Sequence, residues 1–179
     1  VAKGKDGKER RERMFKIGEY VVYGHNGVCQ VTEIGPLKTV TKDEGKLYYT
    51  LIPYGVKGST VFAPVDSQKL PLRRILSREE ALALIDEMQE IAVLGITEER
   101  KREETYKNAL KTCDCKKLVS LIKTIYQRKQ EREAKGKRLT AADSRYFRTA
   151  EHALYDELAA ALETESEKIR DYIIEKIGN

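Results

Sequence analysis

Between residues 15 and 31 the sequence has two short runs rich in β-branched and aromatic residues, joined by a turn. The runs are Tyr20–Tyr23 and Val28–Ile34, and Gly24-His25-Asn26-Gly27 stands between them. Glycine and asparagine tolerate the positive φ angles of a tight turn, so the segment is predicted to form a β-hairpin. The hairpin opens a β-rich unit that ends near Leu72, after which the chain is predicted to be almost entirely helical.

Three further strand candidates follow the hairpin. Leu47–Ile52 and Thr60–Val65 are bounded by glycine- and proline-bearing turns, and Leu70–Leu72 is a short last candidate. Strands this short with local connections predict a small twisted antiparallel barrel. Barrels of this size resemble SH3 and Tudor modules, which mostly bind other proteins.

From residue 73 onward the apolar residues recur with a helical period. Four residues of N-cap type precede such stretches: Ser77, Thr97, Asp114 and Thr140. Ser77 and Glu80 have the spacing of a capping box, and a fifth helix is predicted over residues 166–177. The predicted fold class is α+β, with a Tudor/SH3-like antiparallel β-barrel over residues 14–72 and an all-helical five-helix bundle over residues 73–179. Residues 1–13, which are basic and lack periodicity, are predicted to be a flexible arm, an upstream extension or a remnant of cloning.

Positive charge is concentrated in one helical segment. Residues 97–148 contain sixteen Lys and Arg against eight Asp and Glu, whereas residues 149–179 contain three against eight. Such clustering is typical of a surface that binds phosphates, and a solvated helical face is the alternative. No run of eighteen apolar residues predicts a membrane span, and three cysteines fit a reducing cytoplasm.

No constellation of residues predicts an enzyme, a metal site or a cofactor site. Cys113 and Cys115 form a C-x-C pair without the four ligands that zinc sites bring together, and the two histidines fall in different units. Gly24–Gly27 is not followed by a helix, so it does not predict a phosphate-binding loop. We therefore expect a non-enzymatic protein without a cofactor or a small-molecule substrate.

The order of these segments resembles the CarD/CdnL family of bacterial transcription regulators, over about residues 14–163. Four motifs carry the resemblance through their order and spacing: Phe15–Tyr23 with Gly27, Val61–Pro64, Tyr106–Leu110, and Arg128–Arg132 followed by Leu139-Thr140. The resemblance implies a Tudor-like RNA polymerase interaction domain, similar to that of the transcription-repair coupling factor. In the family this domain docks on the polymerase β subunit by placing a strand edge against a sheet, a mode known as β-augmentation.

The residues that match the polymerase-docking surface lie on one strand and one loop: Lys38, Thr39, Thr60, Val61, Phe62 and Pro64. Phe62 stands where some relatives have an arginine, so the resemblance implies an aromatic contact in place of a charged one. The alternative is that Phe62 is a core residue.

The helical part of the family contacts promoter DNA near the upstream edge of the minus-ten element. Some members insert a tryptophan into the minor groove there, but the matching position is Arg102 and the chain has no Trp. Arg102 is therefore expected either in a narrow minor groove or on a phosphate. The predicted DNA-binding residues are all basic: Arg100, Lys101, Arg102, Lys107, Lys137, Arg138, Arg145 and Arg148.

The expected function is that of a cytoplasmic, nucleoid-associated transcription regulator. It would bind the polymerase β subunit through the barrel and upstream promoter DNA through the basic helices, and so stabilise the open promoter complex. The alternative is a non-specific DNA-binding architectural protein whose barrel binds another protein.

Overall fold

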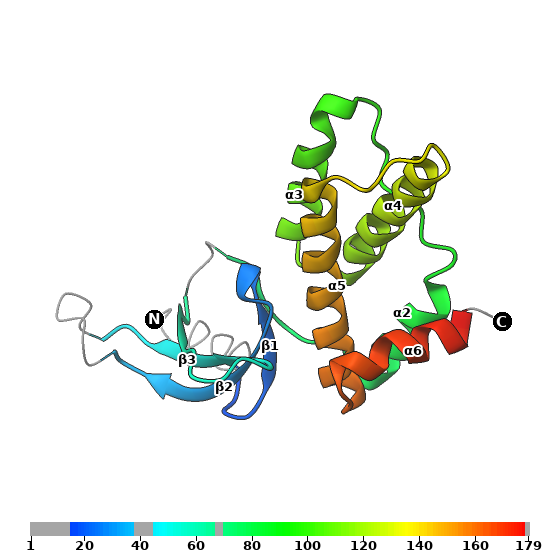
Figure 1. Cartoon of the computed structure of the whole chain (residues 1–179). Coiled ribbons are helices and arrows are strands. Elements are labelled where there is room, and N and C mark those ends of the chain that lie inside the picture. The colour runs from blue at the N-terminus through cyan, green and yellow to red at the C-terminus, as the bar shows by residue number, and fades with distance from the viewer. Residues whose placement is uncertain (1–14, 38–44, 67–69, 178–179) are drawn as a thin grey trace, which may run out of the picture. The chain divides into compact units, whose positions relative to one another are not determined.

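The computed structural model describes residues 15–37, 45–66 and 70–177 (Figure 1). These residues fall into two compact units, divided between Arg74 and Ile75. The first unit contains the β-strands and the second contains the α-helices. The predicted basic arm at residues 1–13 lies outside the described residues.

Five antiparallel strands form one sheet in the first unit, in the order β4-β3-β2-β1-β5. Their bounds are β1 Tyr20–Tyr23, β2 Val28–Gly35, β3 Tyr48–Pro53, β4 Val61–Pro64 and β5 Leu72–Arg74. The predicted strands are confirmed, although the fifth begins at the residue where the prediction ended. Among the described residues β4 and β5 each pair with a single neighbour, so the structure confirms an antiparallel sheet and does not show its closure into a barrel.

The predicted hairpin joins β1 to β2, with Val21 opposite Cys29 and Val22 opposite Val28. A single 3-10 turn, η1 (Gly24–Asn26), connects them. Gly24 has φ +50°, and a Cβ at this position would lie 3.3 Å from the Leu70 side chain. Gly24 therefore satisfies both a left-handed backbone and a close approach.

Alternation along the strands places one face of the sheet in a hydrophobic core. The buried residues of this core are Val21, Tyr23, Cys29, Val31, Tyr49, Leu51 and Ala63. A bulge in β2 between Val31 and Glu33 shifts the register by one residue, and the Thr32 hydroxyl donates to the Thr50 carbonyl at 3.1 Å. The bulge returns Ile34 to the core side, because one inserted residue reverses the facing of all later residues.

The second unit contains five α-helices within the described residues, namely α2 Arg78–Glu87, α3 Arg102–Lys111, α4 Cys115–Glu133, α5 Ala141–Leu162 and α6 Ser166–Ile177. Three predicted caps are confirmed. Ser77 and Glu80 form the capping box, and the side chains of Asp114 and Thr140 accept hydrogen bonds from the amides of Lys117 and Asp143.

The prediction that Thr97 caps a helix is wrong. A 3-10 turn, η2 (Glu99–Lys101), leads into α3, and neither element has a side-chain cap. The preceding segment is held along α4 instead: Lys123 Nζ donates to the carbonyls of residues 88, 89 and 91 at 2.5–3.1 Å, and Thr124 Oγ1 accepts from the Leu94 amide at 2.8 Å. These bonds hold residues 88–94 against α4, and α3 begins only at Arg102, after η2.

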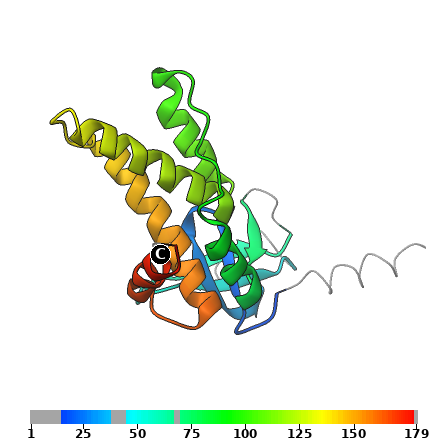
Figure 2. The same cartoon turned by 90° about the vertical axis from the view of Figure 1, so that its right-hand side faces the viewer.

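Helix α5 is the centre of the helical unit and packs against α2, α3, α4 and α6 (Figures 1 and 2). Its buried residues include Ala150, Leu154 and Leu158, whereas Phe147 and Leu162 on the same apolar stripe are half-buried. No helix in the described part of the chain combines the length and hydropathy needed to cross a bilayer.

Candidate functional site

Strand β4 is an edge of the sheet within the described residues, and its exposed aromatic side chain marks a candidate docking surface. Phe62 pairs with Thr50 of β3 and is 48% exposed, while the neighbouring Ala63 is fully buried. Phe62 is therefore not a core residue, which excludes the alternative raised by the sequence. Its side chain shares the outer face of the sheet with Ile52, also exposed, because Thr50 and Ile52 alternate with the buried Tyr49 and Leu51.

Three other predicted docking residues lie in or next to this strand. Thr60 is exposed just before β4, Val61 packs against the core, and Pro64 ends the strand without an amide donor. Lys38 and Thr39 lie outside the described residues. All of these remain predicted polymerase contacts.

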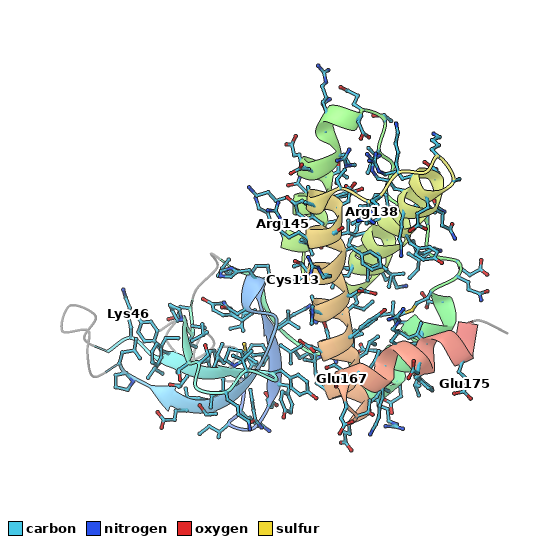
Figure 3. The ribbon with its side chains drawn as sticks, in the orientation of Figure 1. Lys46, Cys113, Arg138, Arg145, Glu167 and Glu175 are labelled. Carbon is cyan, nitrogen blue, oxygen red and sulfur yellow. The ribbon has the colours of Figure 1, made fainter. Side chains whose placement is uncertain are left out.

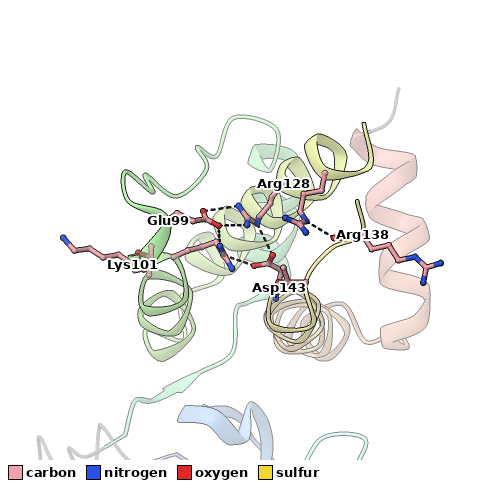
Figure 4. Close-up of polar contacts among 9 residues, drawn as sticks. Glu99, Lys101, Arg128, Arg138 and Asp143 are labelled. Carbon is pink, nitrogen blue, oxygen red and sulfur yellow. Dashed lines mark hydrogen bonds and ion pairs between the residues drawn. The ribbon is translucent and has the colours of Figure 1, made fainter. Parts of the chain in front are cut away.

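A network of four charged side chains joins α3, α4 and α5 at one end of the helical unit (Figure 4). Asp143, fully buried on α5, accepts from Nε of Arg102 at 3.0 Å and from Nε of Arg128 at 3.0 Å. Glu99, in η2, accepts from Nη1 of Arg102 and from Nη1 and Nη2 of Arg128, the last two at 3.2 and 2.5 Å. Each guanidinium therefore uses its Nε on the buried carboxylate and its Nη atoms on the exposed one.

The pKa values around the network follow from burial and these charges. Burial acts to raise the pKa of Asp143, but a hydrogen bond with Thr140 and the guanidiniums of Arg128 and Arg102 outweigh it, so the pKa lies below its ordinary 3.8. Burial, with the nearby Asp143 charge, raises the pKa of Tyr106 to about 12. The Tyr106 hydroxyl is buried and has no hydrogen-bond partner among the described residues. Asp143 is thus held as a carboxylate across the physiological pH range.

The exposed basic residues gather around this network. Arg100 and Lys101 follow Glu99 in η2, and their side chains donate to Glu98 at 2.6 and 2.7 Å. Lys137 and Arg138 are exposed in the turn before α5, where Arg132 Nε donates to the Arg138 carbonyl at 2.8 Å. In Figure 4 the side chains of Lys101 and Arg138 extend away from the network on opposite sides. Two pairs of predicted DNA contacts that are more than thirty residues apart in the sequence therefore flank the same network.

Three other predicted DNA contacts are exposed along α3 and α5. Lys107 lies on α3, and Arg145 and Arg148 lie one turn apart on α5, where the Arg145 guanidinium is 5.3 Å from the centre of the Tyr146 ring. Figure 3 shows Arg138 and Arg145 toward one end of the unit, whereas Glu167 lies on α6 at the other end. Arg138 and Arg145 thus lie away from the acidic Glu167, whereas two other lysines of the positive segment, Lys116 and Lys123, lie beside α2 and its C-terminal end. Contact with DNA stays a prediction for all eight residues.

Arg102 differs from the other predicted DNA contacts because its side chain is only 12% exposed and is bonded to two carboxylates. Its partners Asp143 and Glu99, and Arg128, which shares them, were not predicted as site residues. One signal could have found Asp143: the spacing 143, 147, 150, 154 places it on the apolar stripe of α5. An acid on a buried stripe requires a cationic partner.

The cysteines and the other potential ligands form no metal cluster in the part of the chain that the structure describes. Cys29, Cys113 and Cys115 are buried, and none of them forms a disulfide among the described residues. Asp114 caps α4 between the first two, as expected for a helix-cap loop. Burial raises the pKa of the Cys29 thiol to about 11.

Comparison with known proteins assigns the first unit. Residues 15–76 match the family model described as the CarD-like/TRCF RID domain. No curated protein matches the chain significantly. The match covers the whole of the described sheet, including the β4 edge with Phe62 and the hairpin from which it starts. The first unit of this chain therefore carries a CarD-like RNA polymerase interaction domain.

Proposed function

We propose that this protein is a transcription regulator that holds RNA polymerase through its first unit and promoter DNA through its helical unit. It binds the β subunit at the β4 edge and the DNA near the upstream edge of the minus-ten element, and it stabilises the open promoter complex. The observation that carries the proposal is the polymerase interaction domain at residues 15–76, followed by a helical segment, residues 97–148, with sixteen Lys and Arg against eight Asp and Glu. We propose that it acts by binding, without catalysis or a cofactor, at the nucleoid in the cytoplasm.

The polymerase half of the proposal rests on β4 and on a Tudor-like use of the sheet. A strand edge supplies backbone hydrogen bonds to an added strand, and alternate side chains supply specificity. Phe62, exposed on this edge strand, provides an aromatic contact for the partner.

The polymerase contact is tested by measuring the affinity of the full chain for the isolated β lobe. Phe62→Ser is expected to weaken binding at least about tenfold, the cost of losing one buried aromatic anchor. Val56→Ser is the matched control, because Val56 is equally exposed but lies in the turn before β4. Binding that survives Phe62→Ser unchanged would remove β4 from the interface.

The DNA half of the proposal rests on exposed cations at one end of the helical unit. If they contact phosphates, the logarithm of the binding constant falls linearly with the logarithm of salt concentration, and each contact contributes about 0.9 to the slope. The double variant Arg145→Ala/Arg148→Ala is expected to flatten the slope by about 2. A slope that is flat already in the wild type would refute phosphate contact.

Open-complex lifetime tests the two halves together. A ligand shifts an equilibrium only by its differential affinity for the two states, so the wild type should lengthen the lifetime, and Phe62→Ser and Arg145→Ala/Arg148→Ala should each reduce the effect. A non-specific architectural protein predicts instead equal affinity for duplex and fork-junction promoter DNA and no change in lifetime.

A further inference from the structure

The two arginines of the charged network are arranged as a pair that faces outward. Asp143 holds the Nε atoms of Arg102 and Arg128 from the protein interior, both at 3.0 Å. The Nη atoms of both residues converge on one carboxylate, that of Glu99. We call Arg102 and Arg128 the two-arginine site.

The two carboxylates of the network differ sharply in exposure. The Asp143 side chain is completely buried, whereas the Glu99 side chain is 63% exposed. Moving Asp143 away would leave a buried charge without its ion-pair partner. Displacing Glu99 from the arginines costs little, because exposed ion pairs contribute little net stability. Glu99 also belongs to a 3-10 turn of three residues without a side-chain cap, and a turn of this kind is easily rearranged.

An exposed carboxylate that accepts two bonds from one guanidinium and one from a second occupies a position that suits a phosphate. Guanidinium presents paired donors whose geometry matches carboxylate and phosphate oxygens equally. We propose that Glu99 occupies the place of a backbone phosphate of DNA, and that a DNA phosphodiester displaces Glu99 to bind the two-arginine site. This inference rests on the proposed DNA-binding function and adds to it a specific phosphate site with a built-in competitor.

The charge balance of the network supports an anion at this position. With Glu99 in place, two guanidiniums face two carboxylates and the net charge is zero. When Glu99 leaves, Asp143 neutralises only one of the two arginines, and a positive charge remains on a pair that is largely shielded from water. Lys101 and Arg138 extend on either side of the site (Figure 4), so the field around it also favours a phosphate.

The test compares Glu99→Gln with Glu98→Gln in the full chain, with a promoter-length DNA duplex as the probe. Both variants remove one negative charge from adjacent residues, but among the described residues Glu98 forms ion pairs with the exposed Arg100 and Lys101 and not with the two-arginine site. Glu99→Gln should bind DNA about fivefold more tightly than Glu98→Gln, the equivalent of about 1 kcal/mol. The salt slopes of the two variants should be similar, because the same phosphate occupies the two-arginine site in both. Arg128→Lys, which keeps the charge but not the fork, should abolish the gain when added to Glu99→Gln.

The outcomes separate the inference from the proposed function. If the wild type binds DNA and the two Gln variants have equal affinity, the inference is overturned and the DNA-binding function stands. If neither the wild type nor any variant binds DNA, both the inference and the proposed DNA-binding function are refuted. Should Glu99→Gln be poorly folded, its melting temperature is measured in sodium phosphate and in sodium chloride of equal ionic strength. A larger rise in phosphate for Glu99→Gln than for Glu98→Gln supports the site, and equal rises overturn it.

Discussion

Replacing Asp143 by alanine removes the buried half of the charged network and should strongly destabilise the helical unit. The change breaks two charge-assisted hydrogen bonds of 3.0 Å to guanidiniums that are 12% and 23% exposed. Breaking a buried ion pair from one side costs about 3–5 kcal/mol, and Glu99 remains as a counter-charge. We therefore expect a loss of about 3 kcal/mol, which corresponds to a fall in melting temperature of about 12–24 °C for a unit of this size. Asp143→Asn keeps the volume and one acceptor, so it should lose less, about 2 kcal/mol.

The assay is equilibrium urea unfolding of the full chain followed by far-UV circular dichroism, a signal that the five helices dominate. Asp156→Asn is the matched control, because Asp156 is half-buried on the same helix and, in the part of the chain that the structure describes, accepts from the Ser166 hydroxyl at 2.7 Å and not from a cation. The amide oxygen of asparagine can still accept this bond, so the control should change stability by less than about 1 kcal/mol. If Asp143→Ala and Asp156→Asn cost the same, the network does not stabilise the unit and the reasoning fails.

The pH dependence of the same variants gives an independent check. The pKa of Asp143 in the folded protein lies below its ordinary 3.8. A depressed pKa means that the carboxylate stabilises the fold above the unfolded-state pKa, and that this contribution disappears as the pH falls through the folded-state pKa. The stability difference between the wild type and Asp143→Asn should therefore be constant near neutral pH and shrink below about pH 4. A difference that grows on acidification would contradict the assigned ion pairs.

Three further predictions concern residues away from the network. Lys123→Met removes a cation that donates to three backbone carbonyls just after α2, and it should lower the free energy of unfolding in urea by about 2 kcal/mol. Lys129→Met is the control: it loses one exposed ion pair at 4.0 Å and should lower the free energy of unfolding by less than about 0.5 kcal/mol. Ser77→Ala should lose about 1 kcal/mol with its capping box, and Thr97→Ala should lose almost nothing; equal losses would restore Thr97 as a cap. Burial raises the pKa of Cys29 to about 11, so this thiol should react with a thiol reagent at about pH 8 only after the protein is unfolded. Rapid labelling of Cys29 in the native protein would contradict this prediction and would show that the core of the β-sheet opens.

The strands and most helix starts were predictable because their signals are local. The β-branched residues of Val28–Ile34, which follow a glycine-bearing turn, and the capping residues at Ser77, Asp114 and Thr140 act over a few positions, and the structure follows them. The fifth strand begins at residue 72 rather than 70 for a reason that is also local. Pro71 has no amide to donate, so ladder pairing with β1 begins only after it, at Leu72 opposite Tyr23.

The charged network was not predictable in the same way, because its members are distant in the sequence. Arg102 and Asp143 are 41 residues apart, and Arg128 and Glu99 are 29 apart. Each helix alone gives only an amphipathic pattern, in which an arginine is expected to be exposed. Only the packing of α3, α4 and α5 makes Asp143 the partner of two arginines. The sequence therefore predicted a basic surface, but not the two carboxylates that bind its arginines.

The position of Arg102 also changes how the helical unit would meet DNA. The resemblance aligns this residue with a tryptophan that some relatives insert into the minor groove, where an apolar side chain can wedge apart a base step. In this chain Asp143 anchors Arg102 Nε within the protein, and the side chain is 12% exposed, so deep insertion would break a buried ion pair. The Nη atoms can still reach a phosphate at the surface without that loss. DNA binding by this chain should therefore depend on salt more than on how easily the base pairs unstack, and a mismatch that eases unstacking should change its affinity little.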